Sequence, residues 1–224
     1  MWLDLFMPRR CELCGCRLSD SEDVLCVSCA EQLPLTDDCL SPYDNPTARL
    51  LWGRLTIERG TALMQYNPNS TAAMLIYKLK YGNRPDIAVW FGRYIASMLS
   101  AKPLFDDIDL LIPLPIHKRR ERERGYNQSH EIARGIGDIT NIKVGNDIVE
   151  RSRYTMSQTS LAHKDRTSNV ANAFSLLRPE EIEGKHLLLI DDIITTGATI
   201  AACGQALAEA KGVRISVMTI GRTT

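Results

Sequence analysis

The amino-acid sequence predicts an α/β protein built on a parallel sheet with flanking helices, preceded by a small metal-binding module. Segments with strand and helix patterns alternate between residues 109 and 220, which is typical of a parallel sheet covered by helices. One of these segments, 187–190, is a continuous apolar run, as expected for a strand buried on both faces. Two Cys-x2-Cys pairs precede this region and predict a module held by metal.

The composition limits the classes of protein to which the chain can belong. With 224 residues it can bury one ordinary core and a small appendage. Its 27 basic and 27 acidic side chains cancel, so attraction to nucleic acid must come from a local patch. The apolar runs are too short to cross a bilayer, and the first residues lack the basic start of a signal peptide. We therefore expect a cytoplasmic protein without membrane insertion.

Cysteine is concentrated at the start of the chain, where six of the seven cysteines lie within 39 residues. Two knuckles at this spacing can converge on one tetrahedral zinc ion, and the predicted ligands are Cys11, Cys14, Cys26 and Cys29. Disulfides are the alternative, but cytoplasmic thiols stay reduced, which favours zinc. Cys16 is a spare thiol that can substitute for Cys14 at poorer spacing. Metal must stabilise this ribbon, residues 1–33, because its apolar residues are too few for a core.

The next elements follow from turn residues and apolar periodicity. Residues 34–60 hold prolines, Asp and Asn with little periodicity and predict a connector. Residues 61–224 are expected to form the α/β domain, which starts with a strand at 61–66. Ser70 or Thr71 can cap a helix that stops near Gly82. Another helix begins at Asp86, and its apolar stripe is expected to contain Ile87, Phe91, Tyr94, Ile95 and Met98.

The later elements repeat a strand-and-helix unit. A short buried strand is expected at 109–112 and a second at 147–149, with a helix between them from about Asn127. The expected buried face of that helix contains Ile132, Ile136 and Ile139. A helix at 199–210 follows the 187–190 strand, with Cys203 on its buried face, and Gly212 ends it before a last strand at 214–220.

The strand at 187–190 runs into two acids and then into a loop of hydroxyls and glycine. Ligands of parallel sheets bind beyond the carboxyl ends of the strands, where Asp191 and Asp192 are expected. Consecutive strand residues point to opposite sides, so one carboxylate can face a ligand while the other supports it. A loop with free N–H groups before a helix binds phosphate, and its residues are Thr195, Thr196, Gly197, Ala198 and Thr199. Carboxylates for a sugar diol beside a phosphate cradle indicate a phosphorylated ribose; an acidic turn capped by threonine is the alternative.

Residues 187–199 resemble the phosphoribosyl pyrophosphate (PRPP) motif of type I phosphoribosyltransferases. The resemblance implies that Asp191 and Asp192 hold the ribose diol and act in catalysis, and that the loop binds the 5′-phosphate. Four apolar residues, two acids, two apolar residues and Thr-Thr-Gly-x-Thr match in unbroken order.

A basic segment follows the strand at 109–112. Arginine forks bind phosphate oxygens bidentately, and the segment contains Leu114, Pro115, Ile116, His117, Lys118, Arg119, Arg120 and Arg124. Taken alone, it is better interpreted as a solvated loop, because Glu121 and Glu123 offset two of its charges. Beside a PRPP motif it predicts a second cradle, because type I transferases place their pyrophosphate loop after this strand.

Residues 151–173 are polar and weakly periodic. A long loop inside a compact domain is usually functional or disordered. Transferases of this fold close a loop over the substrate near this point of the chain, and closure excludes water. The resemblance therefore implies that Gln158, Arg166 and Asn169 belong to such a loop.

Taken together, these features resemble the ComF family, which joins an N-terminal zinc ribbon to a phosphoribosyltransferase domain. Nearly the whole chain is covered, and the matching pieces include the cysteine knuckles, Lys80-Tyr81-Gly82, Arg124 to Ser129, Gln158-x-x-Leu161 and the PRPP motif. Membership implies a role in natural transformation, in handling imported single-stranded DNA, with a competence helicase as a candidate partner.

Two functional hypotheses follow from the resemblance, and a third, a structural adaptor whose zinc ribbon docks a helicase or uptake partner, is compatible with either. In the first, PRPP binds without turnover and regulates a protein that handles DNA through a local basic patch. In the second, the chain is an enzyme: Mg²⁺ bridges pyrophosphate and ribose hydroxyls, and a nitrogen acceptor displaces pyrophosphate. The implied cofactors are structural Zn²⁺ and Mg²⁺ bound with PRPP. The acceptor and the oligomeric state have no signal in the sequence.

Overall fold

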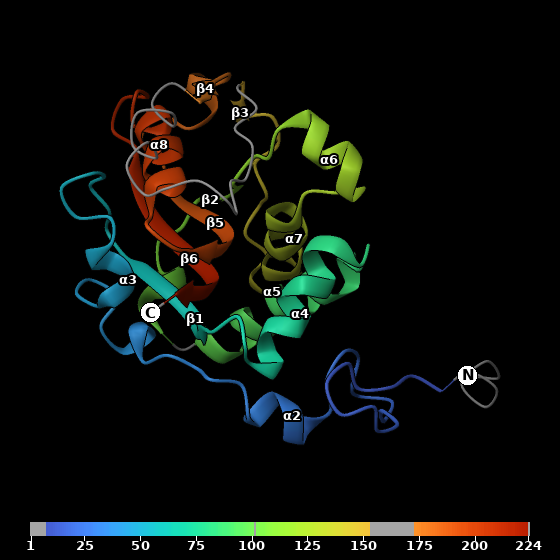
Figure 1. Cartoon of the computed structure of the whole chain (residues 1–224). Coiled ribbons are helices and arrows are strands. Elements are labelled where there is room, and N and C mark those ends of the chain that lie inside the picture. Colours follow the sequence, from blue (N-terminus) through green and yellow to red (C-terminus); the bar gives the residue numbers. More distant parts are fainter. Residues whose placement is uncertain (1–7, 101, 153–172, 224) are drawn as a thin grey trace.

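A four-stranded parallel sheet forms the centre of the protein (Figure 1). The structure is a computed structural model that describes residues 8–100, 102–152 and 173–223. The strand order is β1-β6-β5-β2, and the bounds are β1 Gly60–Tyr66, β2 Leu110–Pro113, β5 His186–Ile194 and β6 Arg214–Thr223. The predicted α/β class with a parallel sheet is confirmed, and four of the five predicted strands lie in this sheet.

Helices cover both faces of the sheet (Figure 1). On one face lie α4 Thr71–Tyr81, α5 Pro85–Leu99 and α7 Gln128–Thr140, and on the other lies α8 Ala198–Leu207. The apolar run of β5 serves both: Leu188 and Ile190 join the first cluster, and Leu187 and Leu189 join the second. This alternation explains why the run is continuous, because both faces of a central parallel strand are buried.

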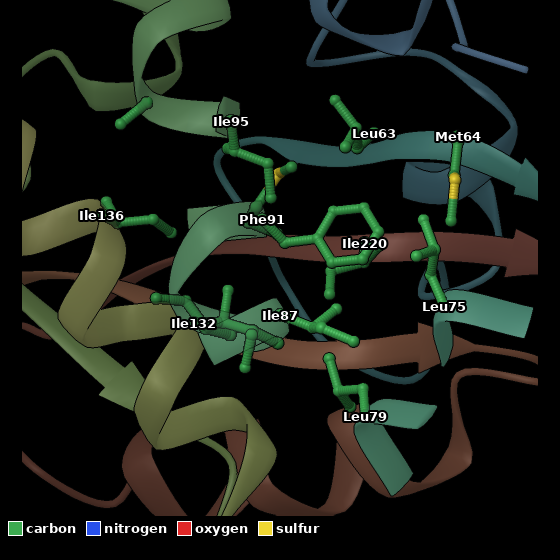
Figure 2. Packing of buried hydrophobic residues seen from close by; sticks show 14 of the residues in the cluster. Leu63, Met64, Leu75, Leu79, Ile87, Phe91, Ile95, Ile132, Ile136 and Ile220 are labelled. Carbon is green, nitrogen blue, oxygen red and sulfur yellow. The ribbon is translucent and has the colours of Figure 1, made fainter. Parts of the chain in front are cut away.

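The larger core cluster fills the space under α4, α5 and α7. Figure 2 shows Phe91 and Ile87 of α5 between Leu79 of α4, Ile132 of α7 and Ile220 of β6. These side chains are almost completely buried. Burial of each large apolar side chain contributes about 1.5–3 kcal/mol, so this cluster fixes the positions of the helices that lead to the site.

Helices α5 and α7 approach each other closely at two glycines. A Cβ atom on Gly92 would lie 2.2 Å from the carbonyl oxygen of Ile132, and one on Gly135 would lie 2.2 Å from that of Val89. No side chain fits at such a separation. The crossing therefore depends on glycine, and it holds the first turn of α7 at the edge of the sheet.

A separate two-stranded antiparallel sheet is formed by β3 Val149–Arg151 and β4 Phe174–Leu176. The sequence predicts its first strand at 147–149, within the parallel arrangement. The chain leaves the parallel sheet earlier, through an isolated parallel bridge between Leu111 and Val144. The polar segment lies between β3 and β4, and Gln158, Arg166 and Asn169 fall outside the described residues.

The basic segment differs most from expectation, because much of it is a helix, α6 Lys118–Arg124. His117 caps it by accepting the N–H of Arg119 at Nδ1 over 3.1 Å, and Gly125 ends it with a left-handed φ of 84°. Glu123, one of the two acids that offset the basic charges, also stabilises the helix, because its Oε1 lies 2.9 Å from Arg119 Nε at i,i+4 spacing.

Two apolar residues expected on buried helix faces are exposed. Met98 is 43% exposed and Ile139 is 44% exposed. Both lie in the last turns of their helices, and in α5 the buried face of that turn contains Ala96 and Leu99 instead of Met98. Cys203 is fully buried beside Ile200 and Leu207, as expected.

The connector contains the short helices η1 Asp38–Leu40 and α3 Pro46–Arg49, and the ribbon contains α2 Val27–Glu31. Two more short helices, η2 Pro103–Phe105 and η3 Pro179–Glu181, precede β2 and β5. The ribbon packs on the rest of the protein through buried Leu18, Val24, Leu25 and Leu33, which belong to the cluster under α4 and α5. Among the described residues, no helix combines the length and apolar character needed to span a membrane.

Candidate functional site

The candidate site lies at the carboxyl end of β5, where the strand turns into α8. Gly197 is the N-cap of α8 and has a left-handed φ of 73°. A Cβ atom there would lie 3.0 Å from Leu51 Cδ2 and 3.1 Å from the carbonyl oxygen of Leu50. The turn therefore needs glycine for both its conformation and its neighbours. Residues 191 and 193–200 line a small cavity of about 40 Å³ at this turn.

The two acids of the site contact different helices. Asp191 Oδ1 accepts the hydroxyl of Ser129, at the start of α7, over 3.2 Å and the backbone N–H of Asp192 over 2.8 Å. Asp192 Oδ1 lies 3.1 Å from the ammonium of Lys80 on α4. Each of the two neighbouring carboxylates thus has its own partner, Ser129 for Asp191 and Lys80 for Asp192.

Burial and the neighbouring charge of Asp192 raise the pKa of Asp191 from its ordinary 3.8 to about 7. The N–H of Asp192, the ammonium of Lys80 and the hydroxyl of Ser129 oppose this shift. At Asp191, burial and the carboxylate of Asp192 therefore have a larger effect on the pKa than the nearby ammonium of Lys80. The raised pKa means that Asp191 keeps its proton to higher pH than an exposed aspartate does.

The first turn of α7 joins the basic segment to the acid pair. Asn127 Nδ2 donates to the carbonyl oxygen of Leu114 over 3.1 Å, and its Oδ1 accepts the N–H of Ser129 over 3.1 Å. Leu114 N in turn donates to the carbonyl oxygen of Ile190 over 2.8 Å. Leu114, the first residue of the predicted pyrophosphate loop, is thus held next to Ile190, which directly precedes Asp191.

Arg120 and Arg124 of α6 interact with residues around the acid pair. Arg124 Nη1 donates to Gln128 Oε1 over 2.8 Å, and its guanidinium lies 5.5 Å from the ring centre of Tyr81. Burial and the charge of Arg120 lower the pKa of Arg151 on β3, and the charge of Asp191 opposes this. Arg151 therefore lies close enough to both groups to connect β3 electrostatically with the acid pair.

A cavity of about 530 Å³ lies beside this assembly, between α6, the start of α7 and β3. Its wall includes Pro115, Lys118, Asn127, Glu131 and Arg151. The volume falls in the ~300–1,000 Å³ range of small-molecule sites. The predicted basic segment therefore borders a space that has room for a small molecule, together with Asn127 at the start of α7 and Arg151 of β3.

Three contacts of the site are not predicted from the sequence. Arg54 of the connector donates from Nη1 to the carbonyl oxygen of Thr196 over 2.6 Å. Ser129 and Lys80 bind the two acids, as described above. The lysines of α4 are recognisable in the sequence as side chains able to reach an anion, but no local signal assigns Arg54 or Ser129 to the loop.

The cysteines form a second site, away from the sheet. The sulfur atoms of Cys11, Cys14, Cys16 and Cys26 all lie within 4.8 Å of one another. Cys14 Sγ and Cys26 Sγ are 3.7 Å apart, close to the ~3.8 Å between two sulfurs of a tetrahedral zinc site with Zn–S bonds of ~2.3 Å. Cys11, Cys14 and Cys26 therefore converge as predicted, and the donor set fits zinc.

The fourth ligand position has two candidate thiols. Cys16 belongs to the tight group, whereas Cys29 interacts with the thiols of Cys14, Cys26 and Cys11. Contacts with Cys14 and Cys26 raise the pKa of Cys16 to about 12, and burial and the same kind of contacts raise that of Cys29. By contrast, backbone N–H donors outweigh burial at Cys11 and lower its pKa to about 6. A bound zinc ion would favour the thiolate forms of these cysteines, because the thiolate is the form that binds metal.

Comparison with known proteins finds similarity in the region that contains this site. A family model described as the phosphoribosyl transferase domain matches residues 124–221, from the end of α6 into β6. DNA utilization protein YhgH of Escherichia coli O157:H7 is 29% identical over 216 residues, covering 95% of this chain and 90% of that protein. Competence protein F of Haemophilus influenzae is 29% identical over 209 residues, covering 87% and 89%. The chain is a homologue of competence protein F.

Other relatives agree with this assignment. Competence protein ComFC of Bacillus subtilis is 28% identical over 162 residues, which cover 70% of this chain and 62% of that protein. A solved structure of the allosteric regulatory enzyme of purine biosynthesis covers 62% of this chain and 29% of its own, at 20% identity and a TM-score of 0.41. That likeness is too weak to bear on function. In this ComF homologue, the matched domain contains the acid pair, the phosphate loop and the start of α7.

Proposed function

We propose that this chain binds PRPP at the turn between β5 and α8 and acts in handling imported single-stranded DNA during natural transformation. The observation that carries the proposal is the pairing of Asp191 and Asp192 with a glycine-dependent turn at the carboxyl end of a central parallel strand. Such a position is where ligands of α/β sheets bind. The similarity to competence and DNA utilization proteins supports the cellular role.

Each part of PRPP meets a matching group in this proposal. The N–H groups and hydroxyls of residues 195–199 bind the 5′-phosphate, helped by the positive end of the α8 dipole. Asp191 and Asp192 accept hydrogen bonds from the ribose hydroxyls. The segment from Leu114 to Arg124 holds the pyrophosphate. Mg²⁺, when bound with PRPP, neutralises part of the charge on the pyrophosphate oxygens.

A DNA-handling role fits the uneven distribution of charge. The whole chain has no net charge, so a general attraction to the DNA backbone is absent. Helix α6 concentrates basic side chains on seven residues, from Lys118 to Arg124. Its guanidinium groups can bind phosphodiester oxygens in the way they bind pyrophosphate, because both present similar acceptors.

Phosphoribosyl transfer is the second candidate function. The cavity of about 530 Å³ bordered by Asn127, Glu131 and Arg151 favours it, because it has room for an acceptor between the basic segment and the start of α7. In that reaction a nitrogen of the acceptor forms a bond to the anomeric carbon of ribose while the bond to pyrophosphate breaks. Asp191 and Asp192 would stabilise the developing positive charge on the sugar, and the basic segment would stabilise the leaving pyrophosphate.

PRPP binding can be tested directly by calorimetry with and without Mg²⁺. Asp191→Ala combined with Asp192→Ala removes both diol acceptors, and we expect loss of binding without unfolding of the sheet. Thr196→Val removes a hydroxyl that accepts the N–H of Ala198 over 3.4 Å, and should weaken binding by about 1–3 kcal/mol. Asp138→Ala, at the far end of α7, is the control. PRPP affinity that survives the double substitution would show that the site is elsewhere.

A pyrophosphate-release assay separates the two candidate functions. The binding proposal predicts slow or absent release with ordinary purine and pyrimidine bases, while rapid release with one of them would establish the enzyme. A screen that includes amines covers less usual nitrogen acceptors.

A further inference from the structure

The last turn of α4 lies between the acid pair and the metal-binding ribbon. Lys80 Nζ is 3.1 Å from Asp192 Oδ1, and Lys78 Nζ is 2.5 Å from Glu12 Oε2. Lys78 also donates to the carbonyl oxygen of Glu12 over 3.3 Å. Two lysines of one helical turn therefore bind groups that belong to different parts of the chain.

The ion pair at the acid site is well shielded from water. The side chain of Lys80 is 23% exposed and that of Asp192 is 11% exposed. An exposed helix lysine is normally solvated, and surface ion pairs contribute little. Here the aliphatic stem of Lys80 leaves the helix and brings its ammonium to the edge of the sheet. The low exposure makes this charge a fixed part of the site.

The ribbon holds this turn of α4 through one carboxylate. Glu12 lies between Cys11 and Cys14, and its side chain is 15% exposed. Its second oxygen, Oε1, accepts Nη1 of Arg84 over 2.7 Å. Glu12 thus binds Lys78 in the last turn of α4 and Arg84, the N-cap of α5. These two residues lie on either side of Lys80 in the chain.

The charge of Lys80 matters because of the ligand. Two carboxylates at the diol site repel a ligand that carries several phosphate charges, unless a cation offsets them. Among the described residues, Lys80 is the cation found in an ion pair with Asp192. Removing it would leave Asp192 without this partner at the point where the ribose hydroxyls must bind.

We propose that Lys80 is a positioning residue of the PRPP site, which neutralises Asp192, and that Glu12 of the ribbon sets the position of Lys80. The inference rests on the proposed PRPP binding and adds a dependence of that binding on the ribbon. Glu12 needs the knuckle fold around Cys11 and Cys14 to reach Lys78. A ribbon that loses its fold would therefore lower the affinity of a site that it does not touch.

The test measures the PRPP dissociation constant of the full, metal-replete chain by calorimetry in the presence of Mg²⁺. Lys80→Met keeps the length of the side chain and removes the charge, and we expect about tenfold weaker binding or more. Lys80→Arg restores the charge and should bind within about threefold of the wild type, which a merely structural role for the lysine stem would not require. Lys211→Met, at an exposed position after α8, is the matched control and should change nothing.

Glu12→Gln tests the link to the ribbon. We expect about fivefold weaker PRPP binding with unchanged zinc content and an unchanged circular dichroism spectrum. Equal affinity in this variant would overturn the role of Glu12, and wild-type or tighter binding by Lys80→Met would overturn the role of Lys80. Failure of the wild-type chain to bind PRPP is a different result, because it would refute the proposed function itself.

Discussion

Asp191 and Asp192 are neighbours in the chain, but the structure gives them different surroundings. Ser129 and a backbone N–H bind Asp191, while Lys80 binds Asp192. Burial, and after it the charge of Asp192, raises the pKa of Asp191. This difference has consequences for pH dependence.

We expect PRPP binding to tighten as the pH rises through about 7, because Asp191 accepts a ribose hydroxyl better when it is ionised. Calorimetry between pH 5.5 and 8.5, a range of about three units around this pKa, measures the effect. PRPP itself titrates near pH ~6, so the comparison is with Asp191→Asn, which should show a flatter profile. Identical profiles would mean that Asp191 does not titrate in this range.

The stability of the free protein should change in the opposite direction. The folded pKa of Asp191 lies above its ordinary value of 3.8, so this group stabilises the fold at low pH and that contribution is lost as the pH rises through about 7. Denaturant unfolding of the wild type and of Asp191→Asn measures the contribution. Their difference in stability should therefore vary with pH between about 4 and 7.

Among the secondary-structure elements, the helices position the side chains of the candidate site. The two glycines at the crossing of α5 and α7 bring Asn127 and Ser129 to the edge of β5. In the sequence, the alternating basic and acidic residues of α6 look like charges that only cancel one another, but in the structure they form a helix. As a helix, it presents its arginines from a capped, regular backbone.

Arg119→Ala combined with Arg120→Ala tests whether α6 binds DNA. We expect weaker binding of single-stranded DNA and a salt dependence that is flatter by ~0.7 in log–log slope for each DNA phosphate that the variant no longer neutralises. Fluorescence anisotropy at several salt concentrations measures both quantities. Arg178→Ala with Lys211→Ala removes the same charge elsewhere and is the control. An equal effect of the two pairs would exclude a specific role for α6.

At the scale of the whole molecule, the ribbon and the sheet domain share one apolar cluster. Leu18, Val24, Leu25 and Leu33 pack with residues of α4 and α5, and Glu12 adds ion pairs across the same interface. The ribbon alone has little else to bury. We therefore predict that a bound metal is needed to keep the ribbon ordered.

Metal removal should unfold the ribbon while the region from residue 71 to residue 224 keeps its fold. Thiolate ligands contribute an apparent ~10–16 kcal/mol to zinc-finger peptides, much of it as folding free energy. We expect one zinc per chain by elemental analysis, and proteolytic sensitivity before residue 34 after chelation or in Cys14→Ser. Cys16→Ser is the informative control, since it should keep zinc if Cys29 is the fourth ligand. Purified protein without stoichiometric metal, or with these thiols in disulfides, would contradict the prediction.

Much of the fold follows from local chemistry in the sequence. The apolar run of β5 requires burial on both faces, and the Thr-Thr-Gly turn after it matches the left-handed Gly197. Ser70 caps α4 by accepting the N–H of Ala73 over 3.2 Å, as predicted. Such features depend on neighbours in the chain, so periodicity and capping rules find them. The helix formed by the basic segment is not predicted, because its i,i+4 charge pairs look like simple cancellation in the linear sequence.

The partners of the site were decided only by tertiary structure. Arg54 and Thr196 are 142 positions apart, and Ser129 and Asp191 are 62 positions apart, yet each pair is hydrogen bonded. At the end of β5, α7 packs on one face of the sheet and brings Ser129, while the connector packs with α8 on the other face and brings Arg54. The chemical groups of the candidate sites can be recognised in the sequence alone: two acids, a Thr-Thr-Gly turn, a basic segment and paired cysteines. Which lysine reaches which acid depends on distances between elements, and those are set by the packing of the core.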